Sequence, residues 1–75
     1  MKTIYHPTYQ ALIQHLIELR KLKGLTQLML AERLGKPQSY VAKIEGCERK
    51  LDVLEFVELC RVLGVSANEM IKIIE

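Results

Sequence analysis

The sequence predicts a single all-α domain made of five short helices. β-Branched residues are scattered singly and no stretch alternates polar and apolar residues, so the signals of strands are absent. Four glycines and two prolines divide the chain into segments whose apolar residues recur at helical spacing. The length of 75 residues suits one domain, and 49% hydrophobic residues with both signs of charge exclude a disordered chain.

The first two helices are predicted from capping residues at their starts and glycines at their ends. Thr8 starts the first helix and Gly24 stops it. Its buried stripe consists of Leu12, Leu16 and Leu19. Thr26 caps the second helix, which ends at Gly35. Its inward residues are Leu30, Ala31 and Leu34. Each segment therefore has one apolar face for a shared core.

The third and fourth helices have different kinds of start. Pro37 suits the first turn of the third helix, where its missing N–H is no loss, and Gly46 lies at the end. The buried side of this helix is formed by Val41 and Ile44. Asp52 followed by Glu55 predicts a capping-box start for the fourth helix, which Gly64 ends. Its core stripe consists of Phe56, Leu59, Cys60 and Leu63.

The fifth helix, from the cap Ser66 toward the C-terminus, is more apolar than one buried stripe requires. Glu69 repeats the capping signature of the fourth helix. Part of this apolar surface should stay uncovered in a monomer, so we expect a dimer contact here. The expected contact residues are Met70, Ile71 and Ile74, assisted by Ile13 and Ile17 of the first helix.

Charge is distributed unevenly along the chain. Residues 20–50 carry eight basic and three acidic side chains, whereas residues 51–75 carry two basic and five acidic ones. A basic middle and an acidic end indicate one face that meets a polyanion and another that avoids it. Ordinary solvated surface explains the charge pattern, taken alone, equally well.

Several other classes of protein are not indicated. No uncharged run approaches the ~20 residues that span a bilayer, and residues 1–7 lack the apolar region of a secretory signal. We therefore expect a cytoplasmic protein with no membrane partner. Cys47 and Cys60 are expected to be thiols, and the spacing of cysteines and histidines favours no metal site. Without a candidate nucleophile, paired carboxylates or a phosphate-binding glycine loop, we expect neither an enzyme nor a cofactor.

Residues 25–45 have the build of a helix-turn-helix. Ala31 is small enough for two helices to cross closely, and Gly35 breaks the chain between them. Several anchors recur at fixed separations along the chain, namely Leu19-Arg20, Gly24-Leu25-Thr26-Gln27, Leu30-Ala31-Glu32-Arg33-Leu34-Gly35, Gln38-Ser39, Val41, Ile44-Glu45 and Leu59-Cys60-Arg61-Val62-Leu63-Gly64-Val65. With these residues the sequence resembles the lambda-repressor-like (XRE) helix-turn-helix family over about residues 12–70. The resemblance implies a compact five-helix lambda-repressor-like domain whose third helix enters the major groove of DNA.

The family positions for base contact carry side chains that can form hydrogen bonds. The resemblance assigns base contacts to Gln38, Ser39, Lys43 and Tyr40. An amide such as Gln38 offers a donor and an acceptor to adenine, and Lys43 can donate to guanine. Tyr40 stands at a variable position, where it could touch a thymine methyl, reach a phosphate or only cover the core. Phosphate contacts are expected from Gln27, which would also brace Gln38, and from Lys36, Arg49 and Lys50.

Two further positions bear on the framework of the site. Arg20 and Glu45 match family positions that commonly form an ion pair between the first and third helices, so we assign them a structural role. The family's usual glycine after the third helix is replaced here by Cys47. The loop could therefore bend differently, which affects the expected aim of Arg49 and Lys50.

The sequence thus predicts a sequence-specific DNA-binding transcriptional regulator over residues 12–75, preceded by an N-terminal extension over residues 1–11. Because one such domain reads few base pairs, we expect a homodimer on a palindromic operator in double-stranded DNA. The alternative is a helical protein-interaction module, or an antitoxin-type partner of another protein, that keeps the same fold. The extension could lengthen the first helix, form an arm that reaches DNA through Lys2, or pack on itself.

Overall fold

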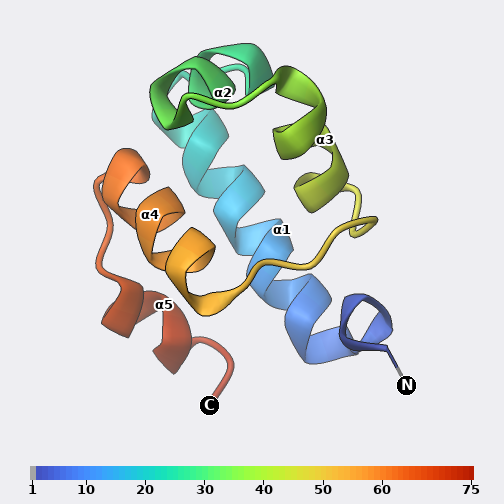
Figure 1. Cartoon of the computed structure of the whole chain (residues 1–75). Helices are drawn as coiled ribbons and strands as arrows, with labels where there is room; N and C mark the ends of the chain where they lie inside the picture. The colour runs from blue at the N-terminus through green and yellow to red at the C-terminus, as the bar shows by residue number, and fades with distance from the viewer. Residues whose placement is uncertain (1) are drawn as a thin grey trace.

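Five α-helices follow a short 3-10 turn in the computed structural model, which describes residues 2–75 (Figure 1). Their bounds are η1 Thr3–Tyr5, α1 Pro7–Leu22, α2 Gln27–Leu34, α3 Gln38–Glu45, α4 Val53–Leu63 and α5 Ala67–Lys72. α1 runs through the middle of the view, with α2 above it, α3 on one side and α4 and α5 on the other. The all-α fold predicted from the sequence is confirmed. None of the described helices is both long and apolar enough to cross a bilayer.

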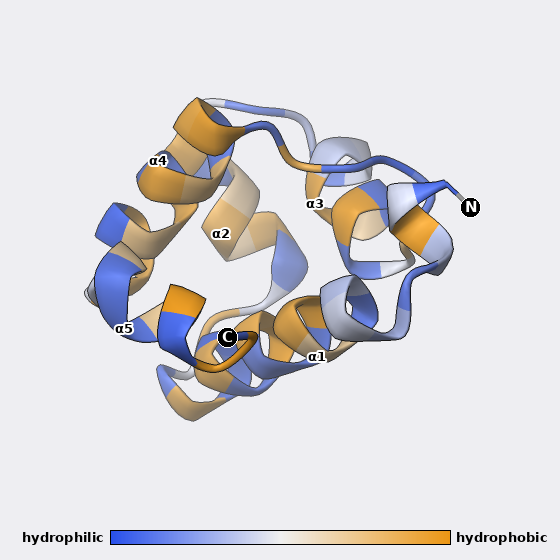
Figure 2. Ribbon diagram, turned by 90° about the horizontal axis from the view of Figure 1, so that it is seen from below, coloured by the Kyte–Doolittle hydropathy of each residue, from blue (hydrophilic) through white to orange (hydrophobic). Residues whose placement is uncertain are grey.

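The hydrophobic core is built from the residues that helical spacing placed inside. Figure 2 shows apolar residues concentrated on α1, α2 and α4 around the centre of the molecule. Ala31 has 0% exposure where α2 packs against α3, as expected for a close crossing of two helices. The buried apolar side chains are Leu12, Ile13, Leu16, Leu25, Leu30, Ala31, Val41, Ile44, Phe56, Leu59, Cys60, Leu63 and Met70.

The start of α1 differs from the prediction because His6, and not Thr8, is its N-cap. The Nδ1 atom of His6 accepts a hydrogen bond from the backbone N–H of Thr8 at 3.1 Å, and the proline between them occupies the first helical position. Residues 7–11 therefore lie within α1. Gln10 donates from Nε2 to the carbonyl of Ile4 at 3.2 Å, which holds η1 against this helix.

The caps predicted for α2 and α4 form as expected, whereas at α5 only the Ser66 hydroxyl accepts, from the N–H of Glu69 at 3.4 Å, and α3 has no side-chain cap. The Thr26 hydroxyl accepts from the N–H of Met29 at 3.0 Å at the start of α2. At the start of α4, Asp52 accepts from the N–H of Glu55 at 2.7 Å, and the Glu55 carboxylate accepts from the N–H of Asp52 at 3.1 Å. This is the predicted capping box. Pro37 is the N-cap of α3 rather than its first helical residue, and it provides no side-chain hydrogen bond.

α3 ends in a turn whose left-handed residue is Cys47, with φ of 54°. The N–H of Cys47 donates to the carbonyl of Ile44 at 3.1 Å, and the N–H of Glu48 donates to that of Lys43 at 2.8 Å. These bonds make a Schellman arrangement, whose left-handed position is most often glycine. The loop therefore bends at Cys47, the position where the resemblance puts a glycine. The glycine nearest to this turn, Gly46, stands one residue earlier and has an ordinary φ of −84°.

Candidate nucleic-acid interface

α2, the turn after it and α3 form a helix-turn-helix. Gly35 ends α2 with φ of 68°, a left-handed conformation that glycine adopts at little cost. Pro37 then leads into α3, and its carbonyl accepts from the N–H of Tyr40 at 3.0 Å. Val41 and Ile44 are buried against the core. These two anchors fix the rotation of α3 about its own axis, so they decide which of its side chains face solvent.

The face of α3 away from the core carries Gln38, Ser39 and Lys43. All three residues are exposed, and their side chains form no hydrogen bond or ion pair within residues 2–75. Ala42 is half-buried on the same face. Ala42 was not among the contact residues predicted from the sequence, although its methyl group suits contact with a thymine methyl. Its spacing of three residues from Ser39 was the available signal.

Tyr40 lies at the edge of α3 that adjoins α4 and is half-buried against the core. Two cations lie over its ring, with Lys36 Nζ at 5.4 Å and the guanidinium carbon of Arg49 at 4.8 Å from the centroid. Burial raises the pKa of the Tyr40 hydroxyl above its ordinary value of 10.0, and nearby Glu55 adds to the rise. Of the three roles that the sequence left open for Tyr40, the contacts within the protein correspond to covering the core.

Arg20 and Glu45 form an ion pair between α1 and the end of α3. Nε and Nη2 of Arg20 donate to the two oxygens of Glu45 at 2.6 and 3.0 Å, and Nη1 donates to the carbonyl of Leu25 at 2.7 Å. The two side chains are only 9% and 11% exposed. Gln27 Nε2 adds a further bond to Glu45 at 2.9 Å. Gln27 therefore supports α3 through Glu45, and within residues 2–75 it makes no hydrogen bond to Gln38, which it was expected to brace.

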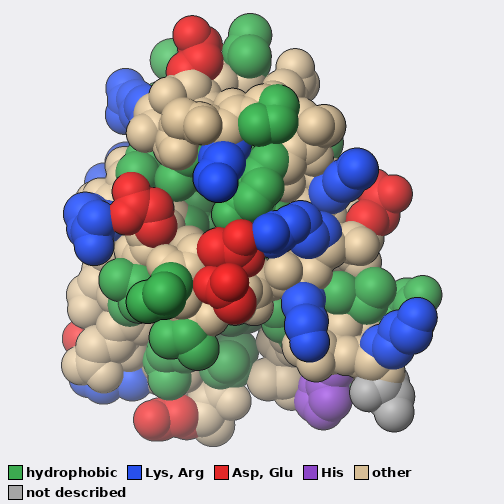
Figure 3. Space-filling model, in the orientation of Figure 1, with side chains coloured by type: hydrophobic (Ala, Val, Ile, Leu, Met, Phe, Trp, Pro, Cys, Tyr) green, Lys and Arg blue, Asp and Glu red, His purple; other side chains and the backbone are tan. Residues whose placement is uncertain are grey.

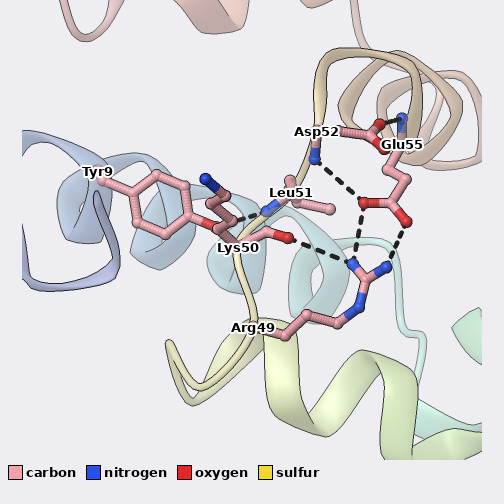
Figure 4. Close-up of polar contacts among 6 residues, drawn as sticks. All are labelled: Tyr9, Arg49, Lys50, Leu51, Asp52 and Glu55. Carbon is pink, nitrogen blue, oxygen red and sulfur yellow. Dashed lines mark hydrogen bonds and ion pairs between the residues drawn. The ribbon is translucent and has the colours of Figure 1, made fainter. Parts of the chain in front are cut away.

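Arg49, expected at a DNA phosphate, is paired with Glu55 of α4, although its side chain is still 39% exposed (Figure 4). Nη1 and Nη2 of Arg49 donate to the two carboxylate oxygens of Glu55 at 2.9 and 2.6 Å, and Nη1 also donates to the carbonyl of Lys50 at 3.3 Å. This carboxylate occupies the edge with which a guanidinium binds phosphate in bidentate fashion. The hydrogen bonds from Arg49 and from the N–H of Asp52 hold the pKa of Glu55 at about 2, below its ordinary 4.5. Glu55 was predicted from the sequence only as part of a helix cap, and its pairing with Arg49 was not predicted.

Tyr9 of α1 holds the same loop from another side. Its hydroxyl oxygen accepts a hydrogen bond from the N–H of Leu51 at 3.0 Å (Figure 4). Burial raises the pKa of Tyr9 above 10.0, so the hydroxyl stays neutral. No sequence signal could reveal this bond, because 42 residues separate its partners.

Exposed lysines surround α3. Lys36 precedes it, Lys43 lies on its last turn, and Lys50 follows it. Lys2 and Lys50 line the same surface hollow, together with Glu48. Figure 3 shows basic side chains gathered on the side of the molecule that carries α3 and the following loop, next to acidic side chains in the middle of this face. Lys36, Lys43 and Lys50 form no ion pair within residues 2–75, so their charges are suited to a polyanion.

The expected dimer contact needs correction at Met70 and Ile13. Both residues are only 2% exposed, because α5 and α1 turn these side chains into the core of their own domain. Ile71 is exposed and Ile74 is half-buried, so these two residues remain available for a partner. Val53, at the start of α4, lines an apolar groove together with Ile71.

Two short helices that cross at a fully buried alanine, the second with a free polar face, define a helix-turn-helix domain of the DNA-binding class. The profile of the family HTH_3, described as Helix-turn-helix, matches residues 16–70. An HTH-type transcriptional regulator of Sinorhizobium fredii, y4dJ, is 40% identical over 53 residues, which cover 71% of this chain and 69% of that protein. The solved structure of an XRE-family like protein from Pseudomonas syringae pv. tomato is 46% identical, with a TM-score of 0.88 over 96% of this chain and 88% of that one. The chain belongs to the XRE-type helix-turn-helix family.

Proposed function

We propose that this protein is a sequence-specific transcription regulator that inserts α3 into the major groove of DNA. The observation that carries the proposal is the free polar face of α3, where Gln38, Ser39 and Lys43 are exposed and unpaired within residues 2–75. Reading base edges requires hydrogen-bonding groups on a helix that is accessible to the groove. Membership of the XRE-type family supports the same class of function.

In this proposal the base contacts come from Gln38, Ser39 and Lys43, with Tyr40 at the edge of the contact. Phosphate contacts come from the exposed lysines on either side of α3, Lys36 and Lys50. Gln27 has a second amide hydrogen beyond the one given to Glu45, and this hydrogen is available to a phosphate at the start of α2. Arg49 is not one of these phosphate contacts, because its guanidinium already binds Glu55.

The operator can be found by selecting bound sequences from a pool of random duplexes. Lys43→Ala should relax the preference at one or two positions, at a cost of about 1–3 kcal/mol in discrimination against the wrong base. Lys50→Ala should weaken all duplexes alike and make the slope of log affinity against log salt shallower by about one. Absence of an enriched motif, or duplex binding that does not depend on salt, would contradict the proposal.

Homodimerisation belongs to the proposal because a single α3 of eight residues contacts only a few base pairs. Ile71 and Ile74, together with Val53 beside Ile71, form the candidate contact surface. Two copies would then place their α3 helices about one helical turn (~34 Å) apart on a palindromic site. The selected motif tests this directly, since a symmetric motif is expected.

A protein-interaction module is the second candidate function. Val53 and Leu54, at the start of α4, are 76% and 80% exposed, and exposed apolar side chains of this kind suit a protein partner. Tight salt-insensitive binding to a protein, without duplex binding by the same preparation, would favour this second function.

A further inference from the structure

The loop between α3 and α4, residues 46–52, is tied to three helices, while the side chain of its single lysine, Lys50, forms no ion pair within residues 2–75. We propose that Glu55 is a positioning residue for DNA binding: it acts through Arg49 to hold this loop, so that Lys50 meets a phosphate without prior rearrangement. The inference rests on the proposed function and adds a residue that does not itself touch DNA.

The first tie connects the loop to α4 and α3. Both carboxylate oxygens of Glu55 accept from Arg49, and one of them also accepts from the N–H of Asp52. The guanidinium of Arg49 lies over the ring of Tyr40 on α3. Figure 4 shows the bonds that join the Glu55 carboxylate to Arg49 and to the N–H of Asp52. Through Arg49 and Tyr40, this one carboxylate links the cap of α4 and the loop to the edge of α3.

The second and third ties fix the backbone on both sides of Lys50. The N–H groups of Glu48 and Arg49 both donate to the carbonyl of Lys43 on α3, at 2.8 and 3.2 Å. The N–H of Leu51 donates to Tyr9 on α1 at 3.0 Å. The Lys50 carbonyl accepts from Arg49, whereas its ammonium group forms no ion pair within residues 2–75. The backbone of Lys50 is therefore held in place while its charge stays available.

A held loop lowers the entropy that must be lost when a lysine binds a phosphate. Loss of the Glu55 carboxylate would release Arg49 and loosen the loop, so DNA affinity should fall. Simple electrostatics predicts the opposite sign, because removal of a negative charge near DNA strengthens binding. The sign of the effect therefore separates a positioning role from a mere neutralisation of Arg49.

The test compares Glu55→Gln with Glu58→Gln, which remove the same charge from the same helix. Glu58 pairs with Arg61 on α4 at 2.5 Å and forms no hydrogen bond or ion pair with residues 46–52 of the loop. Binding is measured by fluorescence anisotropy on a labelled mixed-sequence duplex of about two helical turns (~20 base pairs). We expect Glu55→Gln to weaken binding roughly 3- to 10-fold, whereas Glu58→Gln leaves it unchanged or slightly tighter. Tighter binding by Glu55→Gln would overturn the proposal.

Coupling to Lys50 separates positioning from a general loss of folded protein. Lys50→Ala should weaken binding less in the Glu55→Gln background than in the parent, since the loosened loop already presents this lysine poorly. All variants are measured where circular dichroism shows them fully folded. Equal effects of Lys50→Ala in both backgrounds would also overturn the inference. If the parent protein binds no duplex in a salt-dependent way, the proposed function itself is contradicted. If the parent binds DNA but Glu55→Gln and Glu58→Gln bind equally well, only the positioning role of Glu55 is contradicted.

Discussion

At the scale of single residues, Cys47 holds a backbone conformation that suits glycine. Its φ of 54° costs an L-residue roughly 1 kcal/mol, whereas glycine adopts it freely. Cys47 also packs against the core, so any smaller side chain loses that contact. We therefore expect the free energy of unfolding of the Cys47→Gly variant to be about 1 kcal/mol higher than that of Cys47→Ala, as measured by urea denaturation. Equal stability of the two variants would mean that this turn relaxes when the thiol is removed.

The Arg20–Glu45 pair is the second feature at this scale. The two side chains are 9% and 11% exposed and are joined by two hydrogen bonds, so loss of one partner leaves the other charge buried. Arg20→Ala is expected to lower the free energy of unfolding by about 3–5 kcal/mol, as measured by chemical denaturation. This loss is comparable with the whole stability of a small domain.

The matched control for that prediction replaces both partners. The double variant Arg20→Met with Glu45→Met removes both charges and keeps apolar volume, so it should recover much of the loss seen in Arg20→Ala. If the double variant is as unstable as Arg20→Ala, the hydrogen bonds to Leu25 and Gln27 contribute more than the pair itself.

At the scale of elements, the cap of α4 should make stability depend on acid pH. The pKa of Glu55 is about 2 in the folded protein and lies near its ordinary 4.5 once the chain unfolds. The ionised carboxylate therefore stabilises the fold fully above about pH 4.5, and this contribution disappears as the pH falls from 4.5 toward 2. Exposed ion pairs contribute little in water, so we expect Glu55→Gln to cost about 1 kcal/mol at pH 7 and almost nothing at pH 2.

Denaturation of Glu55→Gln and of the parent at several pH values measures this difference. Glu58→Gln is the control, because Glu58 pairs only with Arg61 on the outside of α4 and takes no part in the cap. A gap between Glu55→Gln and the parent that stays constant from pH 7 to pH 2 would show that Glu55 acts through its shape and not through its charge.

At the scale of the whole molecule, the apolar surface left by α5 should mediate self-association. Ile71 is 40% exposed and lies beside Val53, whereas Met70 is enclosed in the core. Ile71→Asp should leave the fold intact and shift sedimentation equilibrium toward the monomer, since a charge in an apolar contact is strongly disfavoured. Met70→Ala should instead destabilise each monomer by about 2–5 kcal/mol through a core cavity. A parent protein that sediments as a monomer at high concentration would contradict the proposed contact.

Most of the helical framework could be predicted because its determinants are local. Thr26, Asp52 and Ser66 cap helices that begin where the sequence indicates. The buried positions Val41 and Ile44 orient α3 through simple helical spacing. At the start of α1 the prediction was wrong, because His6, and not Thr8, is the residue whose side chain accepts the backbone N–H of the first turn.

The sequence by itself determined the all-α class, the helix-turn-helix and the face of α3 that carries Gln38 and Lys43. Only the tertiary structure decided that Glu55 forms an ion pair with Arg49 and that Met70 of α5 is buried in the core. Helical periodicity states which side chains share a face, but it contains no information on how closely distant segments approach. Ion pairs and burial depend on those distances, so they appear only once the helices are packed.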